Sequence, residues 1–172
     1  LRGLDGSPLP GIGNGPTRLD ASAGAILGIN DRNQVYRTTD GEVWHLIAGP
    51  DHEGSLVSIV HANGEWVLTG SSGLLYRSTN DGDSWTQITP NFSEEPADDY
   101  YEAAAYADGD WWLLIHRDLY RGSTLDSLEP VTLPQDANWN VLYGDPVNDR
   151  VWISGGDYIA YKPADSDNWN DD

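Results

Sequence analysis

Short segments in which hydrophobic and polar residues alternate recur along the chain and predict β-strands. They are rich in β-branched and aromatic residues, and Gly, Asn and Asp separate them. One group of four consists of residues 56–62, 65–70, 74–78 and 84–88. Asn63-Gly64, between the first two segments, is a dipeptide that favours a tight hairpin turn. Since no window of ten or more residues has a convincing helical period, we predict an all-β chain of antiparallel hairpins.

The four-strand group recurs four times, at a period of about forty residues. A Tyr followed by a basic residue marks each copy, and the spacings between these pairs are 40, 44 and 41 residues. The pairs are Tyr36-Arg37, Tyr76-Arg77, Tyr120-Arg121 and Tyr161-Lys162. The repeats cover residues 17–48, 56–88, 100–133 and 139–171. Consecutive four-stranded meanders of this length are typical of the blades of a β-propeller.

We therefore expect residues 17–172 to form a β-propeller-like domain of four antiparallel blades. A β-sandwich also has short strands at regular intervals, but it gives no reason for the same pair to return at every fourth strand. Four blades are the lower limit for a closed ring, so an open arc of a larger propeller is another alternative. Residues 1–16 lie outside the repeat, and their Gly and Pro content predicts a flexible arm or linker.

The turn between the third and fourth strands of the second repeat, STNDGDSW, resembles the Asp-box or BNR repeat, Ser-x-Asp-x-Gly-x-Thr-Trp. The matching positions are Ser78, Gly82, Ser84 and Trp85, with Asn80 in place of the aspartate. A copy one residue shorter, TTDGEVW, carries Thr38, Asp40, Gly41 and Trp44. The fourth repeat keeps Asp165 and Trp169 without the glycine, and the third has lost nearly the whole pattern. The resemblance implies a propeller fold more strongly than any activity.

We interpret these boxes as structural turns. An Asp or Asn side chain accepts hydrogen bonds from its own turn, Gly supplies a positive φ, and Trp covers the turn. A calcium loop is the alternative, but an EF-hand closes with Glu at its twelfth position. Counted from Asn80, that position is Asn91. We predict no cofactor, with calcium as the less favoured possibility.

Charge excludes several classes of function. The chain has 9 Lys and Arg against 28 Asp and Glu, a net charge of −19, which repels nucleic acid and anionic membranes. No apolar run approaches the ~20 residues of a membrane-spanning helix, so we expect no membrane insertion. The absence of Cys excludes disulfides. Strong acidity suits salty surroundings, so we expect an extracellular or virion-surface location. Because the chain opens on Leu1 and lacks Met, we expect it to be processed or part of a longer product.

No catalytic or metal site is predicted. A sialidase-like site, as the family resemblance implies, uses three convergent arginines, whereas Arg37, Arg77 and Arg121 occupy equivalent positions of a repeat. The four histidines show no metal-binding spacing; they are His45, His52, His61 and His116. We therefore predict a non-enzymatic protein, with a glycoside hydrolase as the alternative.

Loops between blades are the candidate interaction sites, since recognition usually sits on loops of a rigid scaffold. The loop at residues 89–99 is the longest and most acidic, and it holds the only Phe of the chain. The candidate residues in this loop and directly after it are Phe92, Glu94, Glu95, Asp98, Asp99 and Tyr100. The loop at residues 48–54 adds His52 and Glu53. Such a loop would suit a basic protein surface, a cation or a glycan.

The function that these observations favour is a non-enzymatic structural or binding module. Its expected partners are other protein subunits, engaged through the arm at residues 1–16 or the loop at 89–99. A virion surface component, such as a phage capsid decoration or tail protein, fits this profile. The alternatives are a secreted glycan-binding or sialidase-like fragment and an assembly factor that binds a partner protein.

Overall fold

The computed structural model describes residues 15–135, 138–163, 166 and 168–171. Most of the predicted arm, residues 1–14, and the predicted turn residue Asp165 lie outside the described residues. The regular structure of the described residues is β throughout, in four sheets. In this part of the chain no helix has the length and apolar character needed to cross a membrane. The all-β, propeller-like prediction is confirmed.

The first two sheets are four-stranded antiparallel meanders in chain order. The first consists of β1 (Arg18–Ala21), β2 (Ile26–Ile29), β3 (Val35–Thr38) and β4 (His45–Ile47). The second consists of β5 (Leu56–Ala62), β6 (Glu65–Gly70), β7 (Leu75–Ser78) and β8 (Thr86–Gln87). Asn63 and Gly64, with φ of 50° and 76°, form the predicted tight turn between β5 and β6.

The third sheet differs from the prediction because it has five strands. It consists of β10 (Tyr101–Ala107), β11 (Asp110–Ile115), β12 (Asp118–Thr124), β13 (Ser127–Val131) and β9 (Asn91–Phe92). β9 comes from the acidic loop and pairs in parallel with β13. The amide N–H of Asn91 donates to Asp126 O, and that of Ser93 donates to Leu128 O. Part of the loop is therefore held at the outer edge of a sheet.

The fourth sheet is again a four-stranded antiparallel meander. It consists of β14 (Val141–Asp145), β15 (Arg150–Gly155), β16 (Tyr158–Pro163) and β17 (Asn170–Asp171). Apart from β9, every strand lies inside one of the four repeats read from the sequence.

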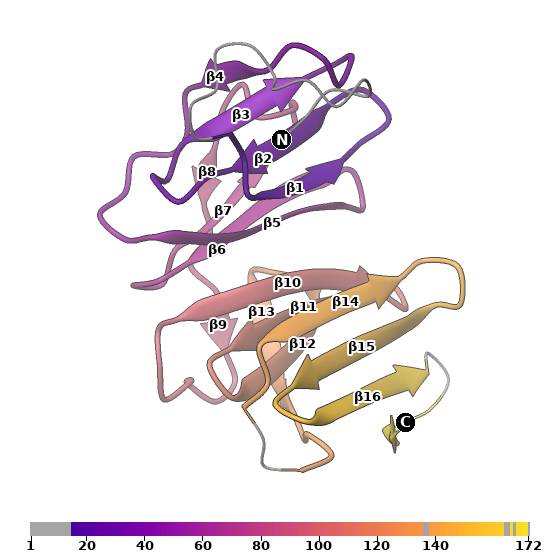
Figure 1. The fold of residues 1–172 in the computed structure, drawn as a ribbon. Helices are drawn as coiled ribbons and strands as arrows, with labels where there is room; N and C mark the ends of the chain where they lie inside the picture. The colour runs from indigo at the N-terminus through magenta and orange to yellow at the C-terminus, as the bar shows by residue number, and fades with distance from the viewer. Residues whose placement is uncertain (1–14, 136–137, 164–165, 167, 172) are drawn as a thin grey trace.

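The sheets follow one another along an arc, with their first strands side by side: β1 against β5, β5 against β10, and β10 against β14 (Figure 1). We call the packed interface between two consecutive sheets a joint. Each joint has its own hydrophobic cluster of buried residues. Representative members are Leu27 and Trp66 at the first joint, Val67 and Leu113 at the second, and Trp112 and Ile153 at the third.

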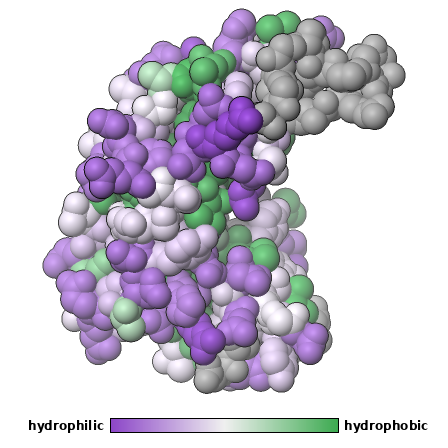
Figure 2. Space-filling model, turned by 60° about the vertical axis from the view of Figure 1, so that its left-hand side comes forward, coloured by the Kyte–Doolittle hydropathy of each residue, from purple (hydrophilic) through white to green (hydrophobic). Residues whose placement is uncertain are grey.

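The arc is open between its two ends. Among the described residues, β14 is not packed against β1 in the way that consecutive first strands are packed. Figure 2 shows the bent outline of the molecule, with a hollow on its right-hand side that hydrophobic residues border. Of the arrangements that the sequence left open, the structure has the open arc.

Register corrects one part of the repeat alignment. In the first three sheets the Arg of the Tyr-Arg pair lies opposite a residue of the second strand that faces the next sheet, so the Arg is on the same face. The pairs are Arg37 with Leu27, Arg77 with Val67 and Arg121 with Trp112. In the fourth sheet the residue at this position is Tyr161, which pairs with Trp152, and Lys162 faces the third sheet. Matching Tyr161-Lys162 to the Tyr-Arg pairs was wrong by one residue, because one step along a strand moves a side chain to the other face.

Candidate functional site

The turn between β3 and β4 is closed by its own side chains. Asp40 Oδ1 accepts hydrogen bonds from the N–H of Glu42 and Val43 and from the Thr38 hydroxyl, at 2.9, 3.0 and 2.9 Å. The N–H groups of Val43 and Glu42, followed by the Thr38 hydroxyl, lower the pKa of Asp40 to about 2. Thr38 Oγ1 in turn accepts from Gly41 N–H at 3.0 Å. This network is the one expected of a structural turn.

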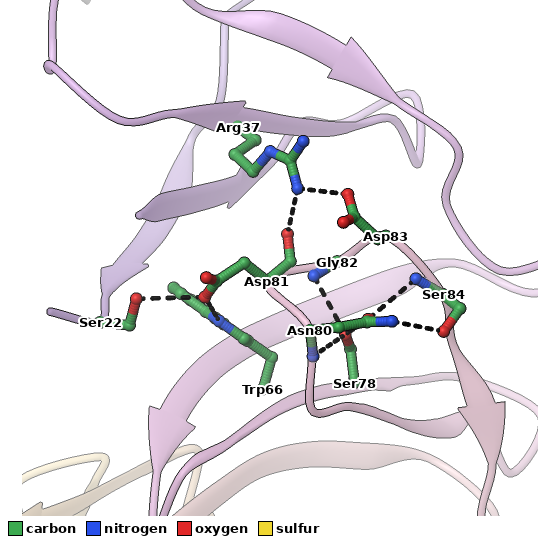
Figure 3. Close-up of polar contacts among 9 residues, drawn as sticks. All are labelled: Ser22, Arg37, Trp66, Ser78, Asn80, Asp81, Gly82, Asp83 and Ser84. Atoms are coloured by element: carbon green, nitrogen blue, oxygen red, sulfur yellow. Dashed lines mark hydrogen bonds and ion pairs between the residues drawn. The ribbon is translucent and has the colours of Figure 1, made fainter. Parts of the chain in front are cut away.

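The turn between β7 and β8 repeats this arrangement with Asn80 in place of Asp40 (Figure 3). Asn80 Oδ1 accepts from Ser84 N–H at 3.0 Å and from the Ser78 hydroxyl at 2.9 Å. Its Nδ2 donates to Ser84 Oγ, and Ser78 Oγ accepts from Gly82 N–H. Trp85 lies against Gly82 of the same turn and packs onto the cluster of the first joint. Trp85 therefore lies over this turn.

The other two predicted tryptophans differ in their partners. Trp169 Nε1 donates to Thr132 O at 2.9 Å, across to the third sheet. The indole nitrogen of Trp44 is buried and finds no hydrogen-bond partner among the described residues.

The box turn of the second sheet also fastens the first sheet to it. Arg37 Nη1 donates to Asp81 O at 2.9 Å and forms an ion pair with Asp83 (Figure 3). Asp81 Oδ1 accepts from Trp66 Nε1 at 2.9 Å and from the Ser22 hydroxyl at 3.2 Å. Asp81 O, Asp81 Oδ1 and Asp83 Oδ1 are therefore engaged by protein groups. Within the described residues no group of three or more acidic or His side chains is placed to hold a metal ion.

The loop at residues 89–99 starts beside the turn between β12 and β13, where Asn91 is bonded to Asp126, and ends beside the turn between β6 and β7, at the opposite end of the strands from the box turns. Its apolar residue is turned into the domain: the Phe92 ring lies 4.9 Å from the Tyr120 ring, edge to face. Phe92 also packs on the cluster of the second joint. Main-chain bonds fix the end of the loop, from Gly73 N–H to Asp99 O and from His116 N–H to Tyr100 O.

Two adjoining hollows open beside this loop. One, of about 490 Å³, is lined by Glu94, Glu95, Asp118, Tyr120 and Trp139 among others. The second, of about 530 Å³, is lined by Phe92, Glu95, Asp98, Asp99 and Tyr101 among others. Glu95 belongs to both linings. We call the carboxylates of the two hollows the acidic rim; its members are Glu94, Glu95, Asp98, Asp99 and Asp118.

The acidic rim acts electrostatically on two tyrosines of the sheet beneath it. Burial is the main cause that raises the pKa of Tyr101, and Asp99 and Glu95 add to it. Burial also raises the pKa of Tyr120, with contributions from Asp118, Glu94 and Glu95. Both tyrosines are therefore neutral phenols in a negative potential.

The same end of the third sheet carries a half-buried carboxyl group. Burial raises the pKa of Glu102, Asp98 raises it further, and His116 opposes the shift. Glu102 Oε2 has no hydrogen-bond partner among the described residues.

The structure brings together only part of the predicted interaction set. Glu94, Glu95, Asp98 and Asp99 share the acidic rim with Asp118, whereas His52 and Glu53 line neither hollow. His52 Nδ1 instead lies 2.9 Å from Gly54 O in the loop before β5. Tyr100 N–H donates to Asp98 Oδ1, and the Tyr100 side chain is exposed.

Sequence reasoning named Tyr101 beside the loop but missed Tyr120, Trp139 and the further acid Asp118. The third sheet contributes Tyr101 from β10 and both Asp118 and Tyr120 from β12. Trp139 precedes β14 of the fourth sheet. The alternation of side chains along a strand could have found Tyr120. It places Tyr120 on the same face of the third sheet as Leu113.

A third hollow, of about 540 Å³, lies where the four first strands converge. Leu19, His61, Tyr106 and Tyr143 each contribute from a different sheet. Asp20 Oδ2 accepts a hydrogen bond from His61 N–H at 2.7 Å and so ties β1 to β5. This hollow is the inner side of the arc.

Comparison with known proteins identifies the fold through structure alone. No family model matches the chain, and no curated protein matches it. The solved structures that resemble it include virginiamycin B lyase from Staphylococcus aureus, at 17% identity and a TM-score of 0.73 over 99% of this chain. They also include YCF48 bound to D1 peptide, at 18% identity and a TM-score of 0.60 over 91% of this chain. YCF48 from Cyanidioschyzon merolae matches at 16% identity and a TM-score of 0.63 over 95% of this chain.

The chain spans little more than half the length of these proteins: 61% of the lyase, 53% of YCF48 bound to D1 peptide and 60% of YCF48 from C. merolae. Likeness at this level of identity defines architecture and leaves activity open. The chain has a β-propeller-like fold of four consecutive sheets.

Proposed function

We propose that this domain is a non-enzymatic protein-binding module whose acidic rim takes up a basic segment of another protein. The observation that carries the proposal is the position of Glu95, which lines both hollows. An extended segment lying across Glu95 would meet carboxylates on either side: Glu94 and Asp118 in one hollow, Asp98 and Asp99 in the other.

The charges of the rim support the choice of a basic ligand. Tyr101 and Tyr120 lie beneath the hollows but are buried, at 7% and 3% exposed, so the carboxylates are the groups that a Lys or Arg side chain would meet. The two linings contain the five carboxylates of the acidic rim and one basic residue, Arg117, so the electrostatic potential there is strongly negative. The net charge of −19 adds long-range attraction for a basic partner.

The structural neighbours support the proposal in one respect. One structural neighbour, YCF48 bound to D1 peptide, is a protein of similar fold that holds a peptide. Virginiamycin B lyase is an enzyme with the same fold, so the fold itself is compatible with either kind of function. The proposal rests on the rim and not on this likeness.

Two narrower proposals accompany it. The hydrogen bonds of the turns at Asp40 and Asn80 support assignment of these turns as Asp-boxes, that is, as structural turns without bound calcium. The excess of acidic residues supports an extracellular or virion-surface setting, where salt screens self-repulsion and the module would engage other protein subunits.

Peptide binding tests the main proposal. The probe is a fluorescein-labelled nonapeptide with alternating Lys and Leu, and its counterpart with Glu for Lys is the peptide control. We expect fluorescence anisotropy to show binding of the Lys peptide alone, weakening between about 0.05 and 0.5 M NaCl as the charges are screened.

A matched pair of double variants locates the site. Glu94→Gln with Glu95→Gln should weaken binding by about tenfold, because two carboxylates of the rim are lost. Glu42→Gln with Glu65→Gln removes the same charge at the other end of the strands and should leave the affinity nearly unchanged. Equal losses in the two double variants, or no binding of the Lys peptide, would overturn the proposal.

A further inference from the structure

The fourth sheet exposes a face that is built like the buried face of a joint. In the first three sheets, one position on the third strand faces the next sheet and is buried: Val35, Leu75 and Leu119 are 1%, 0% and 1% exposed. Register places Ile159 at the equivalent position of the fourth sheet, opposite Ser154 as Leu119 is opposite Leu114. Ile159 is 44% exposed. Its surroundings therefore match a joint from which the next sheet is missing.

Neighbouring residues extend this face across three strands. We call it the outward face of the fourth sheet; it consists of Val141, Tyr143, Trp152, Ile159 and Tyr161. A shallow hollow of about 400 Å³ lies over it; Val141, Tyr143, Trp152 and Ile159 of this face line it together with Ile153 and Ser154. Val141 and Tyr143 are exposed, and the Trp152 and Tyr161 rings lie 4.7 Å apart. A continuous apolar surface of this kind marks an interaction site.

The charges beside this face are already compensated. Arg150 stacks over both rings, 5.4 Å from the Trp152 centroid and 5.1 Å from that of Tyr161. Its Nε lies 3.3 Å from Asp145 Oδ2. The outward face of the fourth sheet is thus nearly neutral although the chain carries a charge of −19.

The opposite end of the arc offers the complementary half of a joint. The outward face of the first sheet consists of Leu19, Gly28, Tyr36 and Leu46, which share one row of the register. In the second sheet the equivalent row contains Leu68 and Tyr76, and these pack against the preceding sheet. Leu19 and Leu46 are exposed, and Pro16 packs directly over Gly28.

We propose that the outward face of the fourth sheet docks onto the outward face of the first sheet of a second copy of this chain. Two arcs then close head to tail into one ring of eight sheets, in which each copy uses both of its ends. The new contacts continue the type of joint that already joins consecutive sheets three times in each copy. A ring of eight blades lies within the known range for propellers, and head-to-tail contacts end when the ring closes.

Sedimentation velocity tests the proposal on the whole chain. The wild-type protein should sediment as a dimer of twice 18.9 kDa, and more completely at high salt, because screening reduces repulsion between two acidic copies. Ile159→Asp on the fourth sheet and Leu46→Asp on the first should each raise the dimer dissociation constant by about tenfold or more. Val147→Asp, at an exposed Val in the turn between β14 and β15, is the matched control and should leave it unchanged.

Mixing the variants distinguishes this ring from other dimers. An equimolar mixture of I159D and L46D should form more dimer than either variant alone, because the mixed ring keeps one intact joint. A dimer that pairs two fourth sheets would respond to I159D but not to L46D, and mixing would not restore it. A monomeric wild-type chain, a dimer insensitive to both variants, or the absence of restoration would overturn the proposal. Circular dichroism of each variant checks that these exposed sites leave the fold intact.

Discussion

Arg77 of the second sheet forms a bidentate ion pair with Asp126 of the third, with Nη1–Oδ2 and Nη2–Oδ1 distances of 2.9 and 3.2 Å. Arg37 makes the corresponding link from the first sheet to Asp83 of the second. In both cases an arginine on a third strand reaches the turn between the third and fourth strands of the next sheet. Arg37 and Arg77 therefore fasten consecutive sheets, whereas Arg121 pairs with Asp110 of its own sheet.

Breaking the Arg77–Asp126 pair should destabilise the protein modestly. Both side chains are partly exposed, so solvent screening limits the loss for Arg77→Met to about 0.5–1 kcal/mol of unfolding free energy. Urea unfolding of Arg77→Met, Asp126→Asn and the double variant measures the coupling between the two residues. A coupling of zero at low salt would show that the pair does not stabilise the joint.

Asn80→Ala should lower the free energy of unfolding by about 1–2 kcal/mol. The substitution removes the hydrogen bonds of Asn80 to the Ser78 hydroxyl, Ser84 N–H and Ser84 Oγ. Asn80→Asp keeps the accepting oxygen and should cost less. The exposed Asn140, changed to Ala, serves as the control. Chemical unfolding checks the order of the three variants. An Asn80→Ala variant of wild-type stability would contradict the structural interpretation of the box.

Acid should selectively remove the contribution of Asp40. Its pKa falls from 3.8 to about 2 on folding, because the N–H groups of Val43 and Glu42 and the Thr38 hydroxyl favour the carboxylate. A lowered folded-state pKa means that ionised Asp40 stabilises the fold above about pH 4 and that this stabilisation is lost as the pH falls toward 2.

Wild type should therefore exceed Asp40→Asn in stability at pH 7, and the difference should shrink between about pH 4 and 2. Urea unfolding at several pH values measures it, with Asp157→Asn in the exposed turn between β15 and β16 as the control. A difference that stays constant with pH would show that ionisation of Asp40 is not what closes the turn.

Salt should stabilise the whole domain. With a net charge of −19, the melting temperature should rise between about 0.05 and 1 M NaCl as repulsion among the carboxylates is screened. Differential scanning calorimetry is the measurement. A melting temperature that is flat or falls over this range would mean that the acidic residues are already compensated.

The sequence was sufficient for the strands and turns because their signals are local. Alternation in residues 56–70 and the turn at Asn63-Gly64 depend on neighbours only a few positions away. By contrast, β9 is two residues long and exists because Asn91 and Ser93 bond to the distant edge strand β13. No local pattern predicts such a strand.

The candidate site was only partly predictable for the same reason. The acids of the loop could be read from the sequence, but their position over Tyr101 and Tyr120 depends on how the third sheet packs. The fourth repeat was aligned one residue away from its true register at Tyr161. A one-residue step moves a side chain to the other face of a strand while hardly changing the sequence pattern.

The most direct test of the central claim is a nitrogen–proton correlation spectrum of the labelled protein, titrated with the alternating Lys-Leu nonapeptide. We predict that the largest chemical-shift changes fall on residues 92–102 and 117–120, which carry the acidic rim and the tyrosines beneath it. Smaller changes are expected at the box turns near Asp40 and Asn80, at the other end of the strands. Shift changes centred on the box turns or on the inner hollow near His61, with residues 92–102 unaffected, would contradict it.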